Sequence, residues 1–138
     1  MSRRGMRWFK LDADIFDDPK VQDLVERHGA EGAGVWLAVM VEMHLSISEG
    51  APFVPSDRLV KRVAFDLQIS RRKARNIIGS LVDVSLLNRE FWEEGKAANE
   101  RVAESCEAYA RRCEALERAR SERWAKPAEA SGDGVGDG

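Results

Sequence analysis

The stretch DRLVKRVAFDLQISRRKARNIIGSLVD, residues 57–83, has the residue pattern of a helix-turn-helix and decides the fold. Its second half begins at Ser70, a favoured N-cap residue because its hydroxyl can accept a hydrogen bond from an unpaired backbone N–H. After Ser70, apolar residues recur at the helical spacing i, i+3, i+4, i+7 and i+8, at Ala74, Ile77, Ile78, Leu81 and Val82. The spacing predicts a helix over residues 70–83 with one apolar face turned to a core.

The opposite face of this second helix is polar and basic, with Arg71, Arg72, Arg75, Asn76 and Gly79. A recognition helix presents its base-reading side chains near its N-terminus. Arginine matches the O6 and N7 atoms of guanine, and asparagine matches the N6 and N7 atoms of adenine. The expected base-reading residues are therefore Arg71, Arg72, Arg75 and Asn76.

The first half of the stretch predicts another helix, which Ser56 or Asp57 can cap. Its apolar side carries Leu59, Val60, Val63 and Leu67. Between residues 57 and 75 there are seven Lys and Arg against two acids, a local net charge of +5, whereas the whole chain has a net charge of −2. A basic patch on a mildly acidic chain is typical of phosphate binding, although two ordinary solvated helix faces would look the same. The expected phosphate contacts are Arg58, Lys61, Arg62, Lys73 and Arg89.

Two further helices are predicted before this stretch. The first spans residues 19–28, with Pro19 at its first position after an aspartate cap and Gly29 as its stop. The second spans residues 31–47 and is apolar around most of its circumference, which predicts a central buried helix. Small residues near its start, Gly32 and Gly34, permit close contact with a neighbouring helix.

The segment after the helix-turn-helix, VSLLNREFW at residues 84–92, is rich in apolar side chains and predicts a β-hairpin. Arg89 would then lie near the tip of a wing. Residues 51–55 predict a short extended piece before the helix-turn-helix. The predicted fold is therefore mainly α with a small β-hairpin, a winged helix-turn-helix followed by a long C-terminal helix.

The C-terminal part of the chain is rich in Ala, Glu and Arg and predicts one long helix. A thin apolar seam follows spacings of four and three residues, at Val102, Cys106, Tyr109, Cys113 and Leu116. Two interpretations stay open, a helix that folds back on the domain and a coiled-coil homodimer. The expected division is 1–95 for the winged-helix DNA-binding domain, 96–124 for the long helix and 125–138 for a disordered tail or linker.

Composition and spacing exclude several classes of protein. The two cysteines lie seven residues apart on one predicted helix, too far for a disulfide, which favours reduced thiols and a cytoplasmic location. No apolar run resembles a signal peptide, and the longest apolar stretch, residues 35–41, is too short to cross a membrane. The sequence has no Cys/His cluster, glycine-rich phosphate loop or nucleophile elbow, so we expect neither an enzyme nor a cofactor.

An acidic cluster precedes the first predicted helix, at Asp12, Asp14, Asp17 and Asp18. Carboxylates in such a cluster could bind Mg²⁺, a cation that prefers oxygen ligands. Aspartates also bond their own backbone in turns and cap helices. The proline at position 19 favours the turn and cap interpretation, and no metal site is expected.

The run WFKLDADIFDDPKVQDLVERHGAEGAGVWLAVMVEMH, residues 8–44, resembles the opening of phage replisome organiser N-terminal domains. These winged-helix, DnaD-like replication initiation proteins share an aromatic residue, aspartate steps and a glycine run that enters a buried helix. The matching positions are Phe9, Asp12, Asp14, Asp17, Asp18, Lys20, Gly29, Glu31, Gly32 and Gly34, then Ala64, Leu67, Ile69 and Ser70. The resemblance covers residues 7–90 and departs at Gln68, where the family often has glycine, and after Gly95.

The resemblance implies a domain that binds double-stranded DNA during phage or prophage replication initiation. A helicase loader or another replisome protein would be a further partner, and no membrane is implied. Two alternatives remain, because a fold does not fix a function. One is a prophage transcriptional regulator of the same fold. The other is a protein-interaction module in which the C-terminal helix binds the partner.

Overall fold

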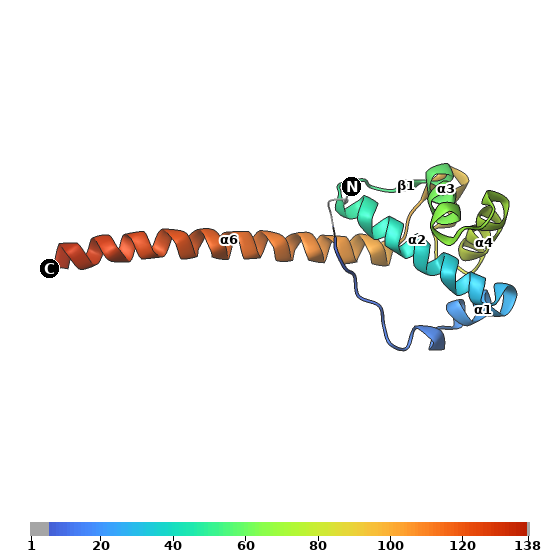
Figure 1. Cartoon of the computed structure of the whole chain (residues 1–138), viewed down its shortest axis with the longest axis horizontal. Helices are drawn as coiled ribbons and strands as arrows, with labels where there is room; N and C mark the ends of the chain where they lie inside the picture. The colour runs from blue at the N-terminus through green and yellow to red at the C-terminus, as the bar shows by residue number, and fades with distance from the viewer. Residues whose placement is uncertain (1–5, 138) are drawn as a thin grey trace. The chain divides into compact units, whose positions relative to one another are not determined.

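The computed structural model describes the backbone of residues 6–137 and the side chains of residues 6–124. These residues form two compact units, the first ending at Cys106 and the second beginning at Glu107. The elements are η1 (Ile15–Asp17), α1 (Pro19–His28), α2 (Ala30–Ser48), β1 (Val54–Pro55), α3 (Ser56–Leu67), α4 (Arg71–Asp83), α5 (Arg89–Glu93), β2 (Lys96–Ala97) and α6 (Glu100–Asp137) (Figure 1).

The first two helices meet where the sequence places a glycine. Asp18 caps α1, because its Oδ1 accepts a hydrogen bond from the backbone N–H of Lys20 at 2.9 Å. Gly29 ends α1 and begins α2 with φ = 66°, a left-handed conformation that suits glycine. A Cβ placed at Gly32 would lie 2.8 Å from the carbonyl oxygen of Leu24. The predicted cap and the predicted close helix contact are therefore confirmed.

The core of the first unit is built around α2, which packs against α1, α3, α4 and β1. Its fully buried apolar side chains include Val35, Val39 and Met43. The prediction of a central buried helix is thus confirmed. One stripe of the helix does face outward, because Leu37 and Val41 are exposed.

The helix-turn-helix forms where the sequence predicts it, from α3 and α4. The turn residue Gln68 adopts a left-handed conformation, with φ = 55° and ψ = 47°, and its N–H closes the end of α3. Ser70 caps α4 by accepting a hydrogen bond from the N–H of Lys73 at 3.0 Å. All five apolar residues predicted for one face of α4 are buried, namely Ala74, Ile77, Ile78, Leu81 and Val82.

The predicted β-hairpin over residues 84–92 is wrong. The small antiparallel sheet pairs β1 with β2 instead, with Val54 opposite Ala97. Residues 89–93 form α5, because Asn88 caps this helix by accepting a hydrogen bond from the N–H of Phe91 at 3.0 Å. The fold class is otherwise as predicted, a mainly α winged helix-turn-helix with a small antiparallel sheet and a long C-terminal helix.

The start of α6 belongs to the first unit, which therefore extends beyond the expected boundary at Gly95. Val102 and Cys106, the first two residues of the predicted seam, are buried, and the Sγ of Cys106 lies 3.7 Å from the carbonyl oxygen of His44. The side chains of residues 107–124 are exposed, except for a half-buried Tyr109. Both cysteines are free thiols.

Along the backbone, α6 runs to Asp137, whereas side chains are described only to Trp124. The expected tail at 125–138 falls on residues whose side chains lie outside the described part, and it stays a prediction. Within the described residues, no helix combines the length and the apolar character that crossing a membrane requires.

Candidate nucleic-acid interface

The first turn of α4 concentrates positive charge. Arg71, Arg72 and Lys73 follow the Ser70 cap, and the turn contains no acid. The N-terminus of a helix already carries a partial positive charge, so cations there are electrostatically unfavourable. The arrangement therefore favours an anion at this end of α4, as helix N-termini favour phosphate groups in other proteins.

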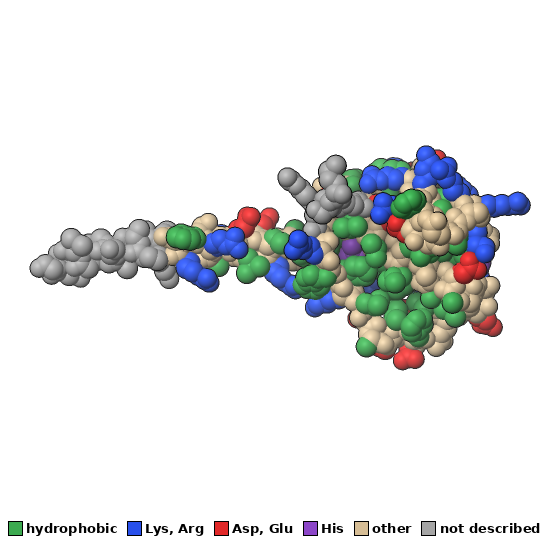
Figure 2. All heavy atoms as spheres, viewed as in Figure 1, with side chains coloured by type: hydrophobic (Ala, Val, Ile, Leu, Met, Phe, Trp, Pro, Cys, Tyr) green, Lys and Arg blue, Asp and Glu red, His purple; other side chains and the backbone are tan. Residues whose placement is uncertain are grey.

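The nine side chains predicted to contact DNA are all exposed. They are Arg58, Lys61 and Arg62 on α3, Arg71, Arg72, Lys73, Arg75 and Asn76 on α4, and Arg89 on α5. Figure 2 shows the blue side chains of lysine and arginine gathered over the end of the first unit that carries α3 and α4. The structure thus brings eight of the nine onto two adjacent helices.

Two cations of α4 are held by acids from neighbouring helices. The Nζ of Lys73 lies 3.0 Å from a carboxylate oxygen of Glu31 on α2. The Nη2 of Arg75 lies 2.8 Å from the Oδ1 of Asp57 on α3. These two ion pairs fasten the first turns of α4 to both neighbours.

Two of the three cations of α3, Arg58 and Arg62, are paired with an acid beneath the helix or within it. Arg62 binds Asp66 one turn later, at 3.1 Å. Arg58 reaches Glu42 on α2 at 3.7 Å, and this carboxylate is only 3% exposed. Glu42 also accepts a hydrogen bond from the Ser46 hydroxyl at 3.1 Å, which helps to offset the cost of burying its charge.

Of the eight cations in the predicted set, three stay unpaired among the described residues. Within the part of the chain that the structure describes, the side chains of Lys61, Arg71 and Arg72 have neither an ion-pair partner nor a hydrogen-bond partner. Asn76 follows them on the outer face of α4, and its side chain is exposed. The unneutralised charge of the helix-turn-helix is therefore located on α3 and the first turn of α4.

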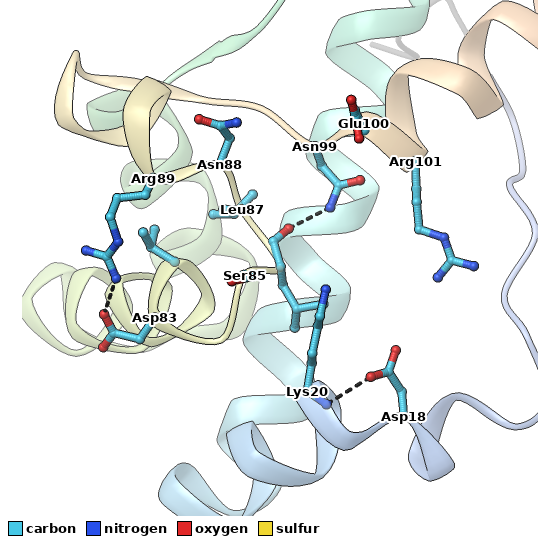
Figure 3. Close-up of a pocket in the computed structure, with 12 residues that line it drawn as sticks. Asp18, Lys20, Asp83, Ser85, Leu87, Asn88, Arg89, Asn99, Glu100 and Arg101 are labelled. Carbon is cyan, nitrogen blue, oxygen red and sulfur yellow. Dashed lines mark hydrogen bonds and ion pairs between the residues drawn. The ribbon is translucent and has the colours of Figure 1, made fainter.

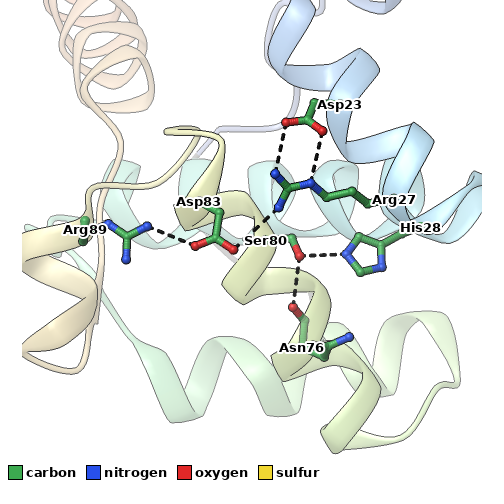
Figure 4. Close-up of polar contacts among 7 residues, drawn as sticks. All are labelled: Asp23, Arg27, His28, Asn76, Ser80, Asp83 and Arg89. Atoms are coloured by element: carbon green, nitrogen blue, oxygen red, sulfur yellow. Dashed lines mark hydrogen bonds and ion pairs between the residues drawn. The ribbon is translucent and has the colours of Figure 1, made fainter.

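The expected place of Arg89 at a wing tip is wrong. Arg89 begins α5 and binds Asp83 at 3.0 Å, and Asp83 also lies 3.7 Å from Arg27 of α1 (Figure 4). Asp83 ends α4, about 18 Å along the helix from Arg71 at 1.5 Å per residue. Arg89 therefore lies at the opposite end of α4 from Arg71 and Arg72, and its role in DNA binding stays a prediction.

Figure 4 also shows polar contacts between α1 and the second half of α4. The Nε2 of His28 lies 2.7 Å from the Ser80 hydroxyl, which in turn donates to the carbonyl oxygen of Asn76 at 3.5 Å (Figure 4). The contact between His28 and Ser80 joins α1 to α4, so these polar side chains help to hold the two helices together.

A cavity of about 430 Å³ lies where α1, α5 and α6 begin and α4 ends (Figure 3). Its lining combines cations and acids, including Lys20, Arg101, Asp18 and Glu100. The amide of Asn99 bridges the wall by donating to the carbonyl oxygen of Leu86 at 2.6 Å. The lining holds three cations and three acids, so its formal charge is balanced and favours neither sign of ligand.

The histidines, cysteines and acids outside the basic face are the remaining candidates for metal ligands or reactive groups. Among the residues with described side chains, no three His, Cys, Asp or Glu lie close enough together to hold a metal ion. His44 is buried, stacks on Phe9 at 4.2 Å between ring centroids, and contacts the carbonyl oxygen of Met40 at 2.7 Å. Burial lowers the pKa of His44 and raises the pKa of the Cys106 thiol.

The fold and this basic face define the class of protein as a winged helix-turn-helix protein with a long C-terminal helix. The chain belongs to the Lin1244/Lin1753-like, N-terminal family, whose sequence model matches residues 8–98. The match contains the helix-turn-helix and both strands and stops just before α6. Comparison with curated proteins gave no match, and comparison with solved structures gave none.

Proposed function

We propose that the first unit binds double-stranded DNA through α4. The observation that carries this proposal is the position of Arg71 and Arg72, two exposed arginines without a partner among the described residues, in the first turn of the helix. Unpaired cations at a helix N-terminus destabilise the free protein, and phosphate would neutralise them. A function in anion binding explains why this costly arrangement exists.

The geometry supports a division of roles across the interface. With α4 in the major groove, Arg71, Arg72, Arg75 and Asn76 reach base edges. The phosphate contacts are Arg58, Lys61, Arg62 and Lys73, with Arg89 at the far end of α4. Four of these five must exchange or share a carboxylate when they bind, whereas Lys61 need not.

We propose that this DNA-binding unit acts in phage or prophage replication initiation. It would be a non-catalytic protein of the cytoplasm, and its protein partner would be a helicase loader or another replisome protein. Support comes from the resemblance of residues 8–44 to replisome organiser N-terminal domains and from the family match over residues 8–98. A prophage transcriptional regulator would use the same interface. Mapping the bound sites separates the two roles, since one predicts a replication origin and the other a promoter.

Fluorescence anisotropy with a labelled random duplex tests the DNA-binding proposal. The expected result is binding that weakens steeply with salt, because each neutralised phosphate contributes about 0.9 to the slope of log K against log salt. A triple variant, Arg71→Glu, Arg72→Glu and Arg75→Glu, should lose binding. Absence of binding by the unaltered protein at low salt would overturn the proposal.

A second candidate function is protein–protein interaction through α6, including formation of a homodimer. It is favoured by two large apolar side chains on the second unit, Leu116 and Trp124, which are 61% and 78% exposed. Sedimentation of the full chain and of a Leu116→Glu variant tests it. A dimer that the substitution dissociates supports this role, and a monomer in both cases contradicts the homodimer.

A further inference from the structure

One residue of the basic face is an acid that pairs with one of its arginines. Asp57 is the second residue of α3 and is 82% exposed, and its Oδ1 accepts a hydrogen bond from the Nη2 of Arg75 at 2.8 Å. If α4 contacts DNA, this carboxylate faces the phosphates and repels them. Its presence therefore needs a reason that outweighs a loss of affinity.

Folding stability explains only in part why an acid stands at position 57. A carboxylate in the first turn of α3 favours the helix, because it complements the partial positive charge of the N-terminus. That effect explains an acid at position 57 but does not require a bond to another helix. An ion pair between two exposed side chains adds little to folding stability.

In the structure, the bond does hold the Arg75 side chain in one orientation. A free arginine side chain samples many rotamers, and ordering it on binding costs conformational entropy. Asp57 engages one donor of Arg75 and leaves the rest of the planar guanidinium open. A guanine edge needs two parallel donors in a defined orientation, so an arginine oriented in advance discriminates better between bases.

We propose that Asp57 is the positioning residue of Arg75 and sets the sequence specificity of the interface at the expense of overall affinity. The inference rests on the proposed DNA binding. The neighbouring pairs cannot serve the same purpose, because Lys73 presents a point charge rather than a planar fork and Arg62 pairs with Asp66 of its own helix. Arg75 combines a guanidinium on α4 with a carboxylate from α3.

Selection from a pool of random duplexes with the unaltered full chain provides the probe. The affinity for the enriched duplex, divided by that for the random pool, gives the discrimination ratio. Asp57→Asn should bind the random pool about three- to tenfold more tightly, since one repelling charge is lost. It should also lower the discrimination ratio about tenfold, because a neutral amide oxygen holds the guanidinium less firmly than a carboxylate does.

The matched control is Asp66→Asn, which removes the same charge from the same helix without touching α4. It should tighten binding to the random pool and leave the discrimination ratio unchanged. Thermal unfolding of each variant checks that the fold is intact. If Asp57→Asn lowers Tm, Asp57→Gln, which removes the same charge and has a better helix propensity, replaces it.

A double-mutant cycle with Arg75→Ala assigns the effect to the pair. Asp57→Asn should not change the discrimination ratio when Arg75 is absent. The proposal is overturned if Asp57→Asn lowers the discrimination ratio equally in the unaltered chain and in Arg75→Ala. It is also overturned if Asp57→Asn leaves the ratio unchanged, or if the selection enriches no sequence. Failure of the unaltered protein to bind any duplex is a different result, because it contradicts DNA binding itself.

Discussion

The Nζ of Lys73 lies 3.0 Å from the Oε2 of Glu31, which joins the first turn of α4 to the first turn of α2. The pair reduces the positive charge of the candidate interface in the free protein. Glu31→Gln should release Lys73 and tighten binding to a random duplex about three- to tenfold, with a salt slope steeper by about one. Anisotropy titrations at several salt concentrations measure both.

Glu107→Gln removes the same charge from an exposed position on α6 and serves as the control. Its affinity and slope should match those of the unaltered protein. Equal gains in the two variants would mean that net charge, and not the release of Lys73, controls affinity.

Replacing Lys61 should separate phosphate contacts from base contacts. Lys61→Ala should weaken binding to all duplexes alike and flatten the salt slope by about one unit. Arg72→Ala should instead cost about 1–3 kcal/mol on the selected duplex and relax specificity at one base pair. Titration of selected and random duplexes with both variants measures the difference, and identical behaviour would refute these roles.

The contact between α1 and α2 predicts a destabilising glycine substitution. Gly32→Ala would place a Cβ 2.8 Å from the Leu24 carbonyl oxygen, and such overpacking costs about 1–3 kcal/mol of the free energy of unfolding. Gly34→Ala is the matched control, because its nearest atom, the Cδ1 of Leu67, would lie 3.9 Å away. That change should be neutral or stabilise by up to about 1 kcal/mol. Urea unfolding of both variants checks the order, and equal stabilities would contradict it.

The turn between α3 and α4 predicts a stabilising substitution. Gln68 has φ = 55°, and a left-handed conformation costs a residue with a side chain about 1–2 kcal/mol. Gln68→Gly should relieve part of this strain and raise the free energy of unfolding by about 1 kcal/mol, less the entropy that glycine gains in the unfolded chain. Urea unfolding measures the gain, while affinity for a random duplex should not change. A loss of stability would show that the hydrogen bond from the Gln68 side chain to the Phe65 carbonyl matters more.

His44 predicts a dependence of stability on pH. Its pKa is lowered from 6.5 by burial, with the Met40 carbonyl acting in the opposite direction, so the unfolded chain binds a proton that the folded protein excludes. The stability is therefore fully present above pH 6.5 and falls as the pH drops below it, by at most about 1.4 kcal/mol per pH unit. Urea unfolding between pH 5 and 7.5 should show this slope. A His44→Gln variant should lack it, and equal slopes would exclude His44 as the cause.

Local periodicity was enough to predict the long helices, although not the five-residue α5. The apolar spacing after Ser70 and the serine cap are properties of adjacent residues, and both reappear unchanged in α4. The same holds for α1, where Asp18 and Pro19 define the start. These features depend on interactions within one helix, which the sequence contains directly.

Long-range pairing was not predictable in the same way. Residues 84–92 looked like a hairpin because they are apolar, yet Val84 and Leu87 are apolar because they enter the core. The strand partner of Ala97 is Val54, more than forty residues earlier. No local pattern specifies such a partner.

In the candidate interface, too, features within one helix were predictable and contacts between helices were not. Its nine residues were predicted as an exposed set, and all nine are exposed, because amphipathic periodicity determines which side of a helix faces outward. The partners Glu31 and Asp57 were not predicted, since each lies on a different helix from the cation it binds. The distinction between paired and unpaired cations therefore comes only from the fold.

The most direct test of the central claim, that α4 contacts DNA, is the change in backbone amide NMR shifts when a random duplex is added to the full chain at low salt. The largest changes should occur at residues 71–76, with smaller changes at residues 58–62 and none at residues 107–124. Shifts confined to residues 107–124, or no shifts at all, would contradict the claim.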